Sequence, residues 1–171
     1  IPTYKLVSDS FINWRGMNES QGRRIKRSLL IKISSIKFLT EKELKVFEKI
    51  QLISDFIKTR NGEIGNENKM KKIDKSILLN GRNLTNLGIF RKYALEYLKS
   101  HKKINQDMTV MCRQLKPTSE GVPLEIYAFS KEKKWEDYEE ITSDIFDHFL
   151  SSLPYFNLEC FELSNNKIIR K

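Results

Sequence analysis

Two residues of this sequence have the types and the spacing of metal ligands. Asp144 and His148 lie four residues apart, so both would occupy one face of a helix. Zinc needs at least three well-placed protein ligands, and this face supplies only two. The other histidine, His101, follows a predicted helix, where its charged form would interact favourably with the helix dipole. We therefore expect a polar helix flank at His148 and no metal centre.

No pattern in the sequence is typical of nucleophilic catalysis or of phosphate binding. Cys112 and Cys160 lie in apolar, strand-like runs without a histidine nearby, and no Gly-x-Ser-x-Gly elbow is present. Neither Gly-x-x-x-x-Gly-Lys nor Gly-x-Gly-x-x-Gly occurs. We expect a protein that is not an enzyme and needs no cofactor. Its two cysteines would be reduced and packed as small hydrophobic side chains, which indicates a reducing compartment.

Length and composition indicate a folded domain, alone or with an appendage. The chain has 171 residues, of which 39% are hydrophobic and 31% charged, and such a chain is too apolar to be disordered. No stretch approaches the roughly 18 uncharged apolar residues that a membrane span needs. The chain starts at Ile1 without a methionine or a signal peptide, so we expect it to be a piece of a longer protein.

The chain is strongly basic, because 31 Lys and Arg outnumber 22 Asp and Glu and give a net charge of +9. The cations cluster in the tract 23–27 and again at Lys69, Lys71, Lys72 and Lys75, whereas residues 132–140 hold five acids. Such an excess can attract nucleic acid, an anionic membrane surface or anionic solutes. For any single cluster, a solvated face is the favoured interpretation.

Hydrophobic periodicity predicts the elements of the first half of the chain. The β-branched residues of 25–38 favour a strand with a break at Ser34-Ser35. Thr40 and Glu43 have the spacing of a capping box, and an apolar stripe behind them predicts one helix as far as Ile57. Residues 58–82 are polar and contain three glycines, which indicates a partly ordered insertion.

The second half has clearer signals. Thr85 caps a predicted helix that ends near Ser100, and alternating residues over 108–113 and 122–128 predict a β-hairpin. A regular apolar stripe predicts a helix over 135–149, which Pro154 ends, and 156–163 has the pattern of a last strand. This order is that of an α+β protein, a ferredoxin-like βαββαβ sandwich with an inserted extra helix. Two helices would cover one face of its antiparallel sheet.

Five segments of the chain resemble one protein family. They are Asn13–Arg27 (NWRGMNESQGRRIKR), Gly81–Arg91 (GRNLTNLGIFR), Met108–Leu115 (MTVMCRQL), Gly121–Tyr127 (GVPLEIY) and Asp144–His148 (DIFDH). In series, they resemble the cytoplasmic C-terminal region of bacterial miniconductance mechanosensitive ion channels, a branch of the small-conductance (MscS-like) family. The resemblance spans the chain from Ile1 to about Phe161.

The resemblance implies a domain organisation. Residues 1–22 would be the C-terminal part of a small β domain, and residues 23–163 would be the α/β cytoplasmic domain of ferredoxin-like topology. Within it, an insertion at about 58–103 would be what the miniconductance branch adds. Residues 164–171 would form a tail.

The resemblance also implies a function. The full-length protein would lie in the bacterial inner membrane, conduct ions when membrane tension rises and protect the cell from hypoosmotic shock. This fragment would lie on the cytoplasmic side, as the wall of a vestibule that filters ions by charge. Its partners would be further copies of itself, a heptamer in the full channel although the fragment alone could be monomeric. The membrane would be contacted only through helices that precede this chain.

No catalytic, cofactor-binding or metal-binding residue is implied by the resemblance. The residues that we expect at the domain junction or in subunit contacts are Trp14, Arg15, Arg23, Arg24 and Arg27. For the arginines, a solvated basic strand edge that blunts aggregation is the alternative.

Two other functions remain as alternatives. A stand-alone RNA-binding module of ferredoxin-like fold would stack bases on aromatic residues of its sheet, and Tyr127 and Phe129 share one face of a predicted strand. The Lys/Arg-Gly-Phe-Gly-Phe signature is absent, however, so core or inter-subunit packing is favoured for both, and no nucleic-acid partner is expected. A regulatory domain that binds a small molecule is the other alternative.

Overall fold

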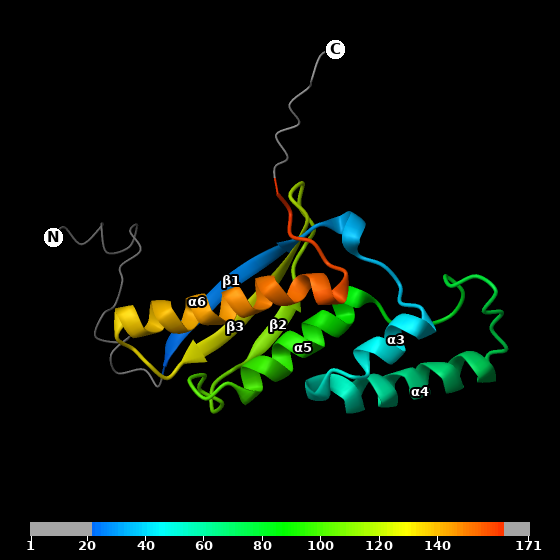
Figure 1. Cartoon of the computed structure of the whole chain (residues 1–171), viewed down its shortest axis with the longest axis horizontal. Coiled ribbons are helices and arrows are strands. Elements are labelled where there is room, and N and C mark those ends of the chain that lie inside the picture. The colour runs from blue at the N-terminus through cyan, green and yellow to red at the C-terminus, as the bar shows by residue number, and fades with distance from the viewer. Residues whose placement is uncertain (1–21, 163–171) are drawn as a thin grey trace, which may run out of the picture.

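Three strands and four α-helices form the described part of the chain, residues 22–162 of a computed structural model (Figure 1). The strands are β1 (Arg23–Ile31), β2 (Met111–Gln114) and β3 (Val122–Ser130), and the helices are α3 (Glu41–Phe47), α4 (Ser54–Met70), α5 (Asn86–Ser100) and α6 (Trp135–Ser152). Short 3₁₀ turns lie at Ile33–Ser35, Gln51–Ile53 and Leu153–Phe156. The predicted small β domain, Trp14, Arg15 and the tail lie outside the described residues.

The strands form one antiparallel sheet in the order β1-β3-β2. Because side chains alternate along a strand, Ile25 and Leu29 of β1 lie on the same face as Leu124 and Ala128 of β3, and all four are buried. α5 and α6 cover this face (Figure 1). The predictions of a mixed α+β domain, of the hairpin and of two helices on one face are confirmed.

The predicted last strand is wrong. After the 3₁₀ turn Leu153–Phe156, Asn157 adopts a left-handed conformation (φ 53°), and the following segment meets β1 in a single bridge between Cys160 and Ile31. Two backbone bonds of 2.8 Å flank that bridge, from Lys32 N to Glu159 O and from Phe161 N to Leu30 O. The sheet therefore has three strands, since this segment pairs too briefly to form a fourth.

The single helix predicted from Thr40 to Ile57 is in fact two. The capping box is present, with Thr40 Oγ1 accepting from Glu43 N (3.4 Å) and Thr40 N donating to Glu43 Oε2 (3.0 Å). The helix ends after Phe47, however, and α4 starts at Ser54. The chain turns between them so that Phe47 and Ile57 both reach the core, while Val46 stays 60% exposed.

The first half of the segment predicted as a polar insertion is helical, because α4 continues to Met70. Its buried residues Ile57, Ile64 and Asn68 form a stripe only one side chain wide. α5, which we expected to be the extra helix, covers the sheet, whereas α3 and α4 lie beside it (Figure 1). Of the four described α-helices, α3 and α4 are therefore the two that do not cover the sheet.

Aromatic rings fill the core between the helices. Phe90 of α5 contacts Phe149 of α6 and Phe156 of the following turn in edge-to-face geometry, with centroids 6.2 and 5.2 Å apart. Phe47 of α3 stacks on Phe156 at 5.4 Å. This cluster joins the sheet-covering helices to α3.

Candidate functional site

The arginine tract of β1 lies along an edge strand of the described sheet. The guanidinium of Arg23 lies over the Tyr138 ring, 4.3 Å from its centroid, and Arg27 forms an ion pair of 2.9 Å with Glu139. Both contacts are with α6. Arg23 and Arg27 thus attach the edge of the sheet to its own covering helix.

Arg24 lies on the other face of β1, where its side chain is exposed. Its backbone carbonyl accepts a hydrogen bond of 2.9 Å from the Tyr138 hydroxyl. A domain-junction role for the three arginines stays a prediction, because Trp14 and Arg15, the other two residues predicted for the junction, lie outside the described part. The edge position and charge of β1 suit the alternative role of blunting aggregation.

The sheet face opposite α5 and α6 carries both aromatic and charged side chains. Tyr127 and Phe129 are half-buried there and pack edge-to-face at 5.5 Å. Beside them, the Glu125 carboxylate is almost fully buried and accepts a hydrogen bond of 2.7 Å from Arg113 Nε. Each of the two aromatic rings thus covers part of the other, and the charges of Glu125 and Arg113 neutralise each other.

A second cluster, which we name the histidine stack, lies between α5 and α6. It consists of Tyr93, Tyr97, His101 and His148. The Tyr97 and His148 rings are parallel to within 8° at a centroid distance of 4.0 Å, and the Tyr93 hydroxyl lies 2.7 Å from His148 Nε2. His101 continues the stack, 5.8 Å from Tyr97. His148 is therefore held by two tyrosines.

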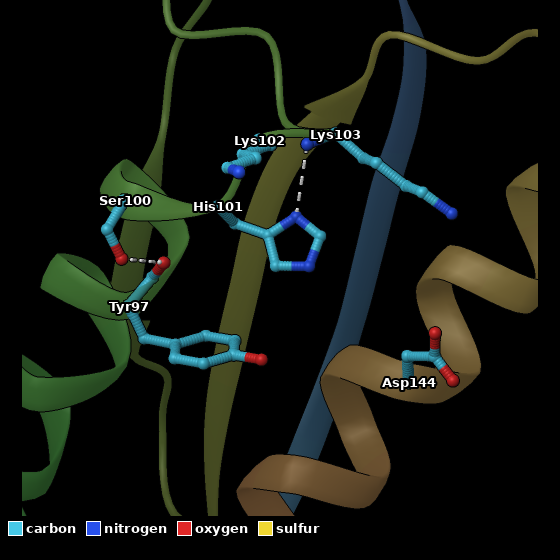
Figure 2. Close-up of a pocket in the computed structure, with 6 residues that line it drawn as sticks. All are labelled: Tyr97, Ser100, His101, Lys102, Lys103 and Asp144. Carbon is cyan, nitrogen blue, oxygen red and sulfur yellow. Dashed lines mark hydrogen bonds between the residues drawn. The ribbon is translucent and has the colours of Figure 1, made fainter.

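The histidine stack borders a shallow depression of about 360 Å³. Figure 2 shows that Tyr97 and His101 from the end of α5 line one side and Asp144 from α6 the other. His101 Nδ1 accepts a hydrogen bond of 3.3 Å from Lys103 N. Within residues 22–162, no three His, Cys, Asp or Glu side chains lie close enough together to hold a metal ion.

Burial sets the protonation of these rings. It lowers the pKa of His148, and together with nearby Lys103 it lowers the pKa of His101. Burial is also the main reason that the pKa of Tyr97 is raised. Both imidazoles are therefore neutral at pH 7, and neither offers a charge for binding an anion.

We expect the domain to lose stability as the pH falls below about 6.5. The unfolded chain binds protons at its histidines with a pKa of about 6.5, whereas the folded pKa values of His101 and His148 are lower. Since the unfolded state then binds more protons, stability is complete above about pH 6.5 and falls as the pH decreases. Urea unfolding at pH 7.5 and 5.5 measures this.

The double variant His101→Gln/His148→Gln is the control for this pH effect and should show a smaller difference between the two pH values. Carboxylates with lowered pKa values, such as Glu43 and Glu96, change the stability mainly below about pH 4.5. They therefore contribute little to the difference between pH 7.5 and 5.5. An unchanged pH dependence in the double variant would assign the effect to other groups.

Sequence reasoning placed Asp144 and His148 on one helix face but missed the tyrosines that hold the histidine. The signal was available: Tyr93 and Tyr97 lie four residues apart and so share one face of α5, and His101 follows four residues later, directly after the helix. The prediction of a polar flank at His148 thus omitted its aromatic partners.

The two cysteines are unpaired, with Cys112 buried beneath the helices and Cys160 half-buried. Burial raises the pKa of the Cys112 thiol to about 12, so it stays protonated and poorly nucleophilic. This agrees with the prediction of cysteines packed as small hydrophobic residues.

No protein-family model matches this chain. Among the described helices, none combines the length and the apolar character needed to cross a lipid bilayer.

Proposed function

We propose that this chain is the cytoplasmic region of a bacterial mechanosensitive ion channel of the MscS-like family, in its miniconductance branch. The observation that carries the proposal is the series of five segments, from Asn13–Arg27 to Asp144–His148, in the order of that family. Any one of these segments is weak evidence by itself. Their number and order make chance resemblance a poor explanation.

The positions of these segments in the fold support the proposal, because several of their residues are ones that the fold requires. Gly121 has a φ of 118°, and a Cβ atom there would lie 2.4 Å from the carbonyl oxygen of Ile31. Asn86 is fully buried, and its side chain hydrogen-bonds to three backbone groups in two other parts of the chain, residues 35–37 and Asn157. We expect a series of segments that contains such residues to occur in proteins that share this fold.

The strand arrangement is consistent with the ferredoxin-like topology that the proposal includes. In that fold, β1 and β3 are central, the β2–β3 hairpin forms one edge and a last strand lies beside β1. Here the order is β1-β3-β2, and Cys160 meets the end of β1 in an antiparallel bridge. The connection from β1 to β2 contains α3 and α4 and ends with α5, which covers the sheet, and α6 follows β3.

In this proposal, the domain has a structural and electrostatic role and no catalytic one. Copies of it would surround a vestibule below the pore, as a heptamer in the full-length protein of the inner membrane. The net charge of +9 would bias which ions reach the pore, since charged walls change local ion concentrations. Permeating ions and further copies of the chain would be its partners.

The RNA-binding alternative is less well supported. It depends on Tyr127 and Phe129, whose rings pack against each other. The adjacent Glu125 carboxylate is buried and paired with Arg113, so the centre of this face offers phosphate groups little net positive charge. This combination is a poor platform for base stacking.

Survival of hypoosmotic shock tests the proposal in cells. The complete reading frame containing this chain would be expressed in a bacterial strain without its own mechanosensitive channels. After transfer from high to low osmolarity, more of these cells should survive than cells with an empty vector. Equal survival, with the protein present in the membrane fraction, would count against the channel role.

A further inference from the structure

The connection between α4 and α5 exposes an unusual amount of apolar surface. Within residues 22–162, eleven large hydrophobic side chains are exposed, and four of these lie in the ten residues 70–79. They are Met70 (85% exposed), Ile77 (60%), Leu78 (38%) and Leu79 (70%). Three consecutive exposed aliphatic residues are a liability in water unless they have a function. We call residues 69–82 the apolar tip.

The apolar tip is a structured loop whose polar side chains hold it together. Asp74 accepts two bonds of 2.9 Å from Ser76, and Asn80 Nδ2 donates to the carbonyl of Asp74 at 2.8 Å. The Lys75 ammonium donates to Asn80 O at 2.8 Å, and Asn83 Nδ2 donates to the carbonyl of Leu78. These polar groups bond to the loop itself, whereas Ile77 and Leu79 are directed to solvent.

The base of the apolar tip is fixed to α4. The Asn68 amide pairs with the backbone of Arg82 through bonds of 2.9 and 3.0 Å. Gly81 (φ 68°) allows this contact, because a Cβ atom there would lie 2.4 Å from Asn68 Oδ1. The apolar side chains are thus presented by a loop anchored at its base.

Positive charge surrounds this apolar surface. The cations are Lys69, Lys71, Lys72, Lys75 and Arg82, against the two carboxylates of Glu67 and Asp74. Glu67 is already paired with Lys71 and Arg82, whereas Lys69 and Lys72 make no ion pair within residues 22–162. The neighbouring groove of about 560 Å³ between α3, α4 and the tip is lined by Lys69, Lys72 and Arg82 as well as by Leu44 and Ile64.

We propose that the apolar tip docks on a membrane surface that contains anionic phospholipids. Aliphatic side chains enter the boundary between headgroups and acyl chains, and lysines beside them interact with anionic headgroups. An acidic protein would match the lysines, but exposed aliphatic residues at the end of a projecting loop suit a bilayer better. The inference rests on the apolar tip and the groove beside it, is independent of the proposed channel function, and would add a membrane contact to the one expected through the preceding helices.

Vesicle cosedimentation of the 171-residue chain tests this proposal. The probes are vesicles of phosphatidylcholine alone and vesicles with about one third phosphatidylglycerol, at about 0.1 M salt. We expect binding to the anionic vesicles to exceed binding to neutral ones about tenfold or more. Comparable binding to both kinds, or binding to neither, would overturn the proposal.

Two pairs of substitutions separate the apolar and the charged contributions. Ile77→Ser/Leu79→Ser and Lys69→Gln/Lys72→Gln should each reduce binding to anionic vesicles about tenfold. The matched controls are Leu150→Ser, at an exposed leucine of α6, and Lys102→Gln/Lys103→Gln beyond the end of α5. Both controls should bind within twofold of the unsubstituted chain.

Circular dichroism melting must show that each variant is folded, which is expected because all the replaced side chains are exposed. If Lys102→Gln/Lys103→Gln weakens binding as much as Lys69→Gln/Lys72→Gln, net charge is responsible and the tip is not the site. If the chain forms a dimer that Ile77→Ser/Leu79→Ser dissociates without changing vesicle binding, the tip contacts a second copy and the proposal fails.

Discussion

Replacing Phe90 with alanine is expected to lower the free energy of unfolding by about 3–5 kcal/mol, the usual range for a fully buried phenylalanine. Phe90 has no exposed surface and lies between Phe149 of α6 and Phe156 of the following turn. Its removal would leave a cavity at the point where α5, α6 and that turn meet. Urea unfolding followed by circular dichroism measures the loss.

Tyr155→Ala is the control for the Phe90 variant. This aromatic side chain is also close to the end of α6 but is 79% exposed, so its removal should change the free energy of unfolding by no more than about 0.5 kcal/mol. Similar losses for both variants would mean that the interior is not packed around Phe90.

Asn86→Ala is expected to have the second largest effect, a loss of about 2–4 kcal/mol. The Asn86 side chain accepts a bond of 2.9 Å from Lys37 N and donates to Ser35 O (2.8 Å) and Asn157 O (3.2 Å). Alanine would leave these part-buried backbone groups without their side-chain partner, and each group left unsatisfied costs about 1–3 kcal/mol. The thermal and urea midpoints should both decrease.

Asn66→Ala is the matched control, because Asn66 is exposed on α4 and alanine is the better helix former. Its stability should be unchanged or slightly higher. If Asn86→Ala were as stable as this control, the hydrogen bonds of Asn86 would not tie the segment before α3 and the segment after α6 to the start of α5.

The elements with strong local signals could be predicted from the sequence. Thr85 caps α5, and the predicted end near Ser100 coincides with the observed end. The regular stripe of α6 packs on the core, and the alternation of β3 places its aliphatic residues under the helices and Tyr127 and Phe129 on the other, half-buried face. Local pattern and tertiary environment agree in these elements.

The elements that sequence reasoning missed depend on contacts between distant residues. No glycine or proline separates α3 from α4, so nothing local indicates that the chain turns after Phe47. Residues 156–163 have the composition of a strand, but the turn at Asn157 leaves room for one bridge to Ile31. Tertiary packing determines both the end of α3 and the short pairing of residues 157–161 with β1.

The candidate sites, like the fold, could be predicted from the sequence only in part. Charge clustering was visible in the sequence, both at Arg23–Arg27 and at Lys69–Lys75. Side-chain geometry determines which arginines contact α6. It also determines that the hydrogen bonds of Asp74 and Asn80 leave Ile77 and Leu79 exposed. Periodicity carries no information on such contacts.

Patch-clamp recording from giant bacterial spheroplasts tests the proposed channel function most directly. The spheroplasts would produce the complete reading frame that contains this chain, in a strain without other mechanosensitive channels. The proposal predicts discrete current steps when suction raises membrane tension, and none in spheroplasts with an empty vector. A tension-insensitive membrane, with the protein demonstrably present in it, would contradict the assignment to this channel family.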